Sequence, residues 1–125
     1  MKSLLTVTAL VEGFTGLALA ATPSFLADIL LGVSLTDPTA IIFGRLAGGA
    51  LITIAFACWL SRTNSQPDIM VKVMLGYNFF ATILLIYAAL IQKFSGFGLW
   101  PAVLVHIGLL VWSVLCLWKP VAKFT

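Results

Sequence analysis

Four stretches of about twenty predominantly apolar residues constrain the fold of this chain more than any other feature. They lie at 4–21, 40–60, 73–92 and 99–118, and about 20 residues of helix suffice to cross the hydrocarbon core of a bilayer. Backbone groups in lipid must pair within one helix or around a closed barrel, and barrel strands alternate in polarity, which these stretches do not. The sequence therefore predicts an all-α integral membrane protein, a four-helix bundle forming a single domain over residues 1–125.

The composition supports a membrane protein and excludes two other classes. Charged residues make up 9% of the chain and apolar residues 62%, whereas a soluble domain has about 25% charged residues. The seven Lys and Arg residues are dispersed and form no basic stripe, so the pI of about 9.1 does not indicate a nucleic-acid binder. Two cysteines are too few for a disulfide-stapled secreted domain.

The connections between the stretches contain polar residues and prolines, which are typical of helix ends. The 22–39 connection contains an apolar segment at 25–31 that is too short to span, and we interpret it as an interfacial helix. The most polar segment, 61–68, separates the two halves of the chain. The first stretch resembles a signal peptide in length, but Glu12 interrupts its apolar run, so we expect it to be retained as a span.

The positions of the cations predict the orientation, because cytoplasmic flanks carry the Lys and Arg excess. With an even number of spans, the two termini and the 61–72 connection share one side. That side holds five cations, Lys2, Arg62, Lys72, Lys119 and Lys123, and the opposite side holds two, Arg45 and Lys93. We therefore expect both termini in the cytoplasm.

Ionisable side chains inside a bilayer are costly and mark candidate sites. Glu12, Arg45 and His106 fall within the predicted spans, all in the outer half of the membrane at a rise of about 1.5 Å per residue. In one interpretation Glu12 and Arg45 form an ion pair that joins the first two spans, and His106 donates to a neighbour. In another they form a polar pocket open to the outside, where Glu12 takes up a proton or cation. In a third, Arg45 extends to lipid phosphates.

No catalytic or cofactor-binding constellation is visible in the sequence. A b-type haem needs two axial ligands, and His106 is the single histidine of the chain. Cys58 and Cys116 lie near the cytoplasmic ends of their spans without a CxxC spacing, so we interpret them as small core residues. We therefore expect no metal, no cofactor and no enzymatic activity.

Small and aromatic residues suggest two further surfaces. Gly44 and Gly48, followed by Gly49, give the second span a face that allows close helix approach, either within the bundle or between two copies of the chain. A candidate groove for a lipophilic ligand consists of Tyr77, Asn78, Phe79 and Trp112.

Two resemblances follow from these motifs. Glu12, within the segment Leu10-Val11-Glu12-Gly13-Phe14-Thr15-Gly16, resembles the membrane-embedded Glu of the small multidrug resistance transporters, which implies a proton and cation site. The connections at 22–39 and 61–72 are longer than in that family. The overall plan resembles the DoxX-like group of small bacterial four-helix membrane proteins, through a first span ending near Pro23, the segment 43–48 and Trp100-Pro101. This resemblance implies a bacterial inner membrane and, for some members, an accessory role in redox systems.

From these observations we expect a non-enzymatic protein that acts as an oligomer or as an accessory subunit of a larger membrane complex. Its partners would be membrane lipids and other membrane subunits or a second copy, with no nucleic acid. The Gly44 and Gly48 face would provide the interaction surface. The alternatives are a small transporter or ion pathway that uses Glu12, and a module that binds a lipid, a quinone or a carotenoid.

Overall fold

The computed structural model describes residues 1–118, and all regular secondary structure in that range is helical. The helices are α1 (Lys2–Ala21), α2 (Pro23–Leu31), α3 (Pro38–Ser61), α4 (Pro67–Leu90) and α5 (Leu99–Trp118). All except α2 are long and apolar enough to cross a membrane. The predicted all-α, four-span membrane bundle is therefore confirmed, and α2 is the short helix expected near 25–31.

Prolines and caps set the helix boundaries. Pro23 is the first residue of α2, and Thr22 before it has a non-helical backbone, as the residue preceding a proline generally does. Asp37 caps α3 by accepting a hydrogen bond from the Ala40 amide at 2.9 Å. At the end of α2, Gly32 adopts a left-handed backbone with φ of 71°, and its amide donates to the Asp28 carbonyl.

Helix α4 begins earlier than the apolar pattern predicted, at Pro67 instead of residue 73. Its first turns are polar and include Asp68 and Lys72, which form an ion pair at 3.2 Å one turn apart. Proline at the first helical position and an acidic residue in the first turn both favour a helix start. Hydropathy located the membrane-embedded part of this helix and missed the polar turns before it.

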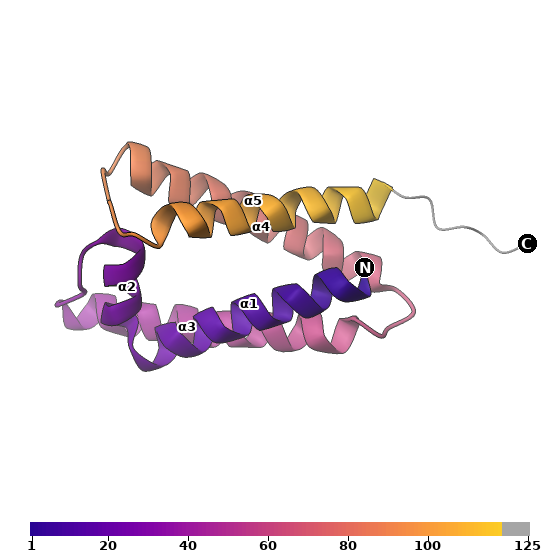
Figure 1. The fold of residues 1–125 in the computed structure, drawn as a ribbon. Helices are drawn as coiled ribbons and strands as arrows, with labels where there is room; N and C mark the ends of the chain where they lie inside the picture. The colour runs from indigo at the N-terminus through magenta and orange to yellow at the C-terminus, as the bar shows by residue number, and fades with distance from the viewer. Residues whose placement is uncertain (119–125) are drawn as a thin grey trace, which may run out of the picture.

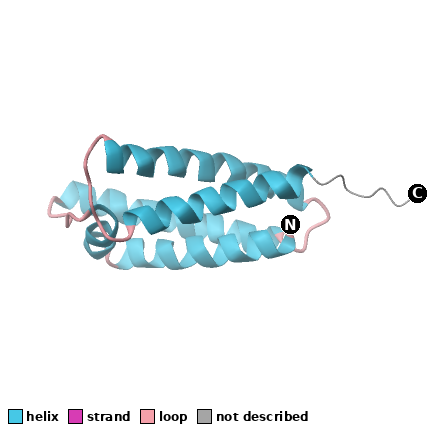
Figure 2. Ribbon diagram, turned by 45° about the horizontal axis from the view of Figure 1, so that its top comes forward, coloured by secondary structure: helices cyan, strands magenta, loops and turns pink. Residues whose placement is uncertain are grey.

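The spanning helices form two antiparallel pairs, α1 with α3 and α4 with α5 (Figure 1). Most of the packing lies within each pair, and much less lies between the pairs. The N-terminus, the 62–66 connection and the end of α5 lie at one end of the bundle, and α2 and the 91–98 connection lie at the other (Figures 1 and 2).

Helices α1 and α3 meet at two glycines. A Cβ added to Gly16 would lie 2.9 Å from the carbonyl oxygen of Gly48, and one added to Gly48 would lie 2.7 Å from the carbonyl oxygen of Gly16 and overlap the backbone of Ala20. The two backbones are therefore in direct contact, a separation that no larger side chain would permit. Gly44, one turn away from Gly48, packs against the Pro23 ring.

The small-residue face of α3 is thus used within the chain. Of the two roles expected for Gly44 and Gly48, packing within the bundle is the one that the structure shows, because α1 and the start of α2 cover both residues. Gly49 has no neighbouring atom within 4 Å of its added Cβ and faces away from the bundle.

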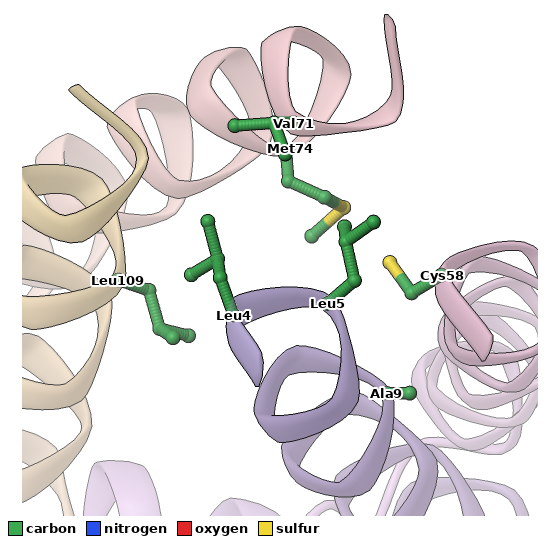
Figure 3. Packing of buried hydrophobic residues seen from close by; sticks show 7 residues of the cluster. All are labelled: Leu4, Leu5, Ala9, Cys58, Val71, Met74 and Leu109. Atoms are coloured by element: carbon green, nitrogen blue, oxygen red, sulfur yellow. The ribbon is translucent and has the colours of Figure 1, made fainter. Parts of the chain in front are cut away.

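At the end that holds the N-terminus, a buried apolar cluster joins the two pairs. Side chains from α1, α3, α4 and α5 point toward one another there (Figure 3). Its members are Leu4, Leu5, Ala9, Cys58, Val71, Met74 and Leu109. Cys58 is completely buried and Cys116 packs against the cluster, so both occupy the core positions expected of small side chains.

At the opposite end, α2 is hydrogen-bonded to the connection between α4 and α5. The amides of Ser95 and Gly98 donate to the carbonyls of Leu31 and Ile29, at 3.3 and 2.9 Å. A Cβ on Gly96 would overlap the backbone of Ile29 and Leu30. Contacts at both ends therefore hold the two helix pairs together.

We expect Gly48→Ala to lower the free energy of unfolding by about 1–3 kcal/mol, because the new methyl group would be forced into the α1 backbone. Thermal unfolding in detergent measures the effect. The matched control is Gly49→Ala, which meets open space and should leave the melting temperature unchanged or slightly higher, since alanine favours helix over glycine. Equal effects of the two changes would contradict the assigned contact.

Candidate functional site

A cluster of polar side chains lies in the interior of the bundle. Glu12 projects from α1, Tyr77 and Asn78 from α4, and His106 from α5. The Tyr77 hydroxyl donates a hydrogen bond to Glu12 Oε2 at 3.0 Å, across the gap between the two pairs. The Tyr77 and His106 rings meet edge to face, with centroids 5.8 Å apart. Tyr77 therefore connects two residues that the sequence had placed in one site.

Asn78 fixes the position of His106. Its side chain is completely buried, and its Nδ2 donates to the Met74 carbonyl at 2.8 Å. The Oδ1 atom lies 2.8 Å from Nδ1 of His106. This pair holds α4 and α5 together at mid-span, and it turns the remaining edge of the imidazole away from Asn78.

Glu12 is buried without full hydrogen bonding. The residue is 1% exposed, and within residues 1–118 its Oε1 atom has no hydrogen-bond partner. Thr8, one turn earlier on α1, is also buried with an unpartnered hydroxyl. Buried polar atoms without partners are costly, and an isolated carboxylate in apolar surroundings is costlier still. The single hydrogen bond from Tyr77 is therefore important for this region.

The predicted ion pair between Glu12 and Arg45 is wrong. Arg45 is exposed on α3, and the one ion pair in the part of the chain that the structure describes joins Asp68 and Lys72. The reason is the register of the antiparallel pair. Gly13 contacts Ala55, so Glu12 lies near that turn of α3, about 15 Å of helix from Arg45 at the usual rise per residue.

An apolar cavity of about 570 Å³ lies between the two helix pairs. Three polar residues line it, Thr15, Tyr77 and His106. Leu26 and Leu30 of α2 reach it from one end. The remaining lining is aliphatic or aromatic and consists of Val11, Leu19, Ala47, Ala50, Leu51, Ile54, Phe80, Ala81, Leu84, Leu85, Ala102 and Val105.

The core cluster borders this cavity. Ile54 and Tyr77 line the cavity and also pack against the cluster of Figure 3. Tyr77 and His106 thus mark the polar part of the cavity wall, and Tyr77 links it to the buried Glu12. Glu12 itself is buried and does not belong to the lining.

The candidate groove of Tyr77, Asn78, Phe79 and Trp112 is also not formed. Tyr77 lines the cavity and Asn78 is buried, whereas Phe79 is 57% exposed and lies over a separate shallow depression with Gly76 and Leu110. Residues two positions apart on a helix point about 200° apart, so Tyr77 and Phe79 face different sides. Trp112 is exposed on α5 and does not line the cavity.

Thr8 and Thr15 are members of this region that the sequence interpretation missed. Thr8, Glu12 and Thr15 are spaced four and three residues apart, which places them on one face of α1. This spacing in the sequence indicates a polar stripe on one face of the helix. The small alanines lining the cavity gave no comparable signal.

No model of a known protein family, no curated protein and no solved structure matches this chain. The resemblances to the DoxX-like group and to small multidrug resistance transporters therefore remain predictions.

We expect Tyr77→Phe to lower the free energy of unfolding by about 1–3 kcal/mol, because it removes the one hydrogen bond that residues 1–118 make to the buried Glu12 carboxyl. Chemical or thermal unfolding in detergent measures this loss. Adding Glu12→Met should restore most of the stability, since replacing both partners by apolar groups leaves no polar atom unpaired.

Two control variants accompany the Tyr77→Phe and Glu12→Met measurements. Tyr87→Phe changes an exposed tyrosine, and Arg45→Gln removes an exposed cation that does not pair with Glu12. Both should leave stability within about 0.5 kcal/mol of the unmodified protein. A loss from Arg45→Gln as large as that from Tyr77→Phe would restore the ion-pair interpretation.

Proposed function

We propose that this protein binds a lipophilic small molecule in the cavity between its two helix pairs. The observation that carries the proposal is the combination of an apolar wall with a few polar groups, Thr15, Tyr77 and His106. Ligand sites are typically cavities of about 300–1,000 Å³ with mainly apolar walls and a few orienting polar groups, and a volume of about 570 Å³ falls in that range.

The exposure of several lining residues supports entry from the bilayer. Phe80, Leu84 and Val105 line the cavity and are 68%, 54% and 43% exposed. They belong to membrane-spanning helices, so the cavity opens toward the hydrocarbon region. A ligand dissolved in the membrane would enter laterally between the α4–α5 pair and the α1–α3 pair. Its polar end would lie toward Tyr77 and His106.

This proposal now ranks ahead of the other two functions considered from the sequence. An accessory or oligomeric role depended on the Gly44 and Gly48 face, which is occupied within the chain. A transport role depended on Glu12 facing a water-accessible cavity, and Glu12 is buried outside the lining. A lipid, a quinone and a carotenoid all belong to the class of ligand that the cavity suits.

We further propose a bacterial inner membrane with both termini in the cytoplasm. By the bounds of the helices, Lys2, Arg62 and Lys72 lie toward one end of the bundle, and Arg45 and Lys93 lie toward the other. Lys119 and Lys123, the other two cations predicted on the cytoplasmic side, lie outside the described residues. The larger number of cations at the N-terminal end supports this orientation.

Reporter fusions test the orientation. Alkaline phosphatase, which is active only outside the cytoplasm, should be inactive when fused to the C-terminus and active when fused after Lys93 in the 91–98 connection. Green fluorescent protein at the same two positions should give the opposite pattern. Phosphatase activity at the C-terminus would contradict the proposed orientation.

Native mass spectrometry of the protein gently extracted from its own membrane tests the binding function. We expect a bound small molecule in the unmodified protein and reduced occupancy in Ala50→Phe, which places a ring in the cavity. Gly49→Phe is the matched control. Gly49 is next to Ala50 in the sequence, but it faces open space and does not line the cavity. Partner chains in fixed ratio with no small molecule would instead favour the accessory role.

A further inference from the structure

The polar wall of the cavity has defined hydrogen-bonding roles, which restrict the chemistry of a ligand. This inference rests on the proposed binding function. The protein sets the orientation of the Asn78 amide. The atom nearest the Met74 carbonyl must be the Nδ2 donor, because two oxygens without a hydrogen between them repel. Oδ1 is therefore the atom that faces His106.

The orientation of Asn78 fixes the tautomer of His106. Oδ1 of Asn78 can only accept, so Nδ1 of His106 must carry the hydrogen that joins them across 2.8 Å. In a neutral imidazole with hydrogen on Nδ1, the Nε2 atom is an acceptor. Nε2 makes no hydrogen bond to any other residue in the range 1–118, and it is absent from the buried side-chain atoms there that lack a partner, so it is solvent-accessible at a residue that lines the cavity. His106 thus offers an accessible lone pair in the cavity wall.

Tyr77 offers an acceptor as well. Its single hydroxyl hydrogen is donated to Glu12 Oε2, which leaves the lone pairs of the phenolic oxygen for any further partner. Thr15, the third polar residue of the wall, has a hydroxyl that can donate or accept and does not discriminate. Neither fixed group, Tyr77 or His106, therefore has a hydrogen to donate to a ligand.

We propose that the ligand is a lipophilic alcohol, and that Nε2 of His106 accepts the hydrogen bond from its hydroxyl group. A carbonyl, ether or ester placed at the same point would bring a second lone pair against an acceptor. It would leave His106 unpaired in an apolar cavity, which is the costly outcome for a buried polar group. The apolar part of the ligand would contact the aliphatic wall between the pairs.

Three matched probes test this proposal on the unmodified protein, reconstituted in lipid nanodiscs at about pH 8, where an ordinary imidazole is neutral. The probes are farnesol, farnesal and farnesyl methyl ether, which share one chain and differ in the ability of the end group to donate. Native mass spectrometry titrations give their relative affinities. We expect farnesol to bind about tenfold more tightly than either of the others.

Variants assign the preference to His106. His106→Phe should reduce farnesol binding to the level of the methyl ether and leave the ether unchanged. Val105→Ala, its neighbour in the cavity wall, is the control and should weaken all three probes by the same factor. Asn78→Leu removes the fixed acceptor, so the imidazole can place its hydrogen on Nε2, and the affinity for farnesal should rise relative to farnesol.

A spectroscopic measurement tests the tautomer directly. His106 is the single histidine of the chain, so protein labelled with ¹⁵N-histidine reports one ring. The chemical shifts should show hydrogen on Nδ1 and none on Nε2.

The outcomes separate this inference from the function on which it rests. If none of the three probes binds, the proposed binding function fails and the inference fails with it. If all three bind equally, or if Nε2 carries the hydrogen, the alcohol preference is wrong and the binding function stands.

Discussion

The direct backbone contact between α1 and α3 determines how the rest of the bundle is arranged. Gly16 and Gly48 bring these helices so close that neither position has room for a Cβ. Four helices of similar length could pack symmetrically, with a continuous core along the axis. Here the close contact concentrates packing within one pair, α4 and α5 form the other, and the space between the pairs is filled only in part.

The polar residues are placed where the two pairs face each other. The Tyr77–Glu12 hydrogen bond crosses that gap, and the Asn78–His106 pair lies within the α4–α5 pair beside it. Because lipid offers no hydrogen bonds, the partners of these groups come from the protein or from a bound molecule. The protein provides a partner for each end of the Asn78 amide and, among residues 1–118, gives Nε2 of His106 none. The structural contacts and the proposed ligand contacts thus lie in one short layer of the bundle.

The sequence predicted the spans well and their mutual contacts poorly. Long apolar stretches determine which segments enter a bilayer, so α1, α3 and α5 were located to within two residues at each end. The register of two packed helices depends on both of them together. Neither the sequence of α1 nor that of α3 alone indicated that Glu12 lies level with Ala55 and not with Arg45. Glu12 and His106 were correctly placed in one region, but Tyr77 was assigned to a groove with Phe79 because they are close in sequence.

The backbone hydrogen bonds between α2 and the 91–98 connection bear on how such a site can change during evolution. The amides of Ser95 and Gly98 bind carbonyls of α2 whatever side chains line the cavity. The apolar cluster at the opposite end is similarly separate from most of the lining. These backbone hydrogen bonds help to maintain the spacing of the two pairs without using side chains of the cavity wall. On the proposed function, lining residues such as Ala47, Ala81 and Ala102 could vary in size to fit differently shaped molecules while these backbone contacts remain.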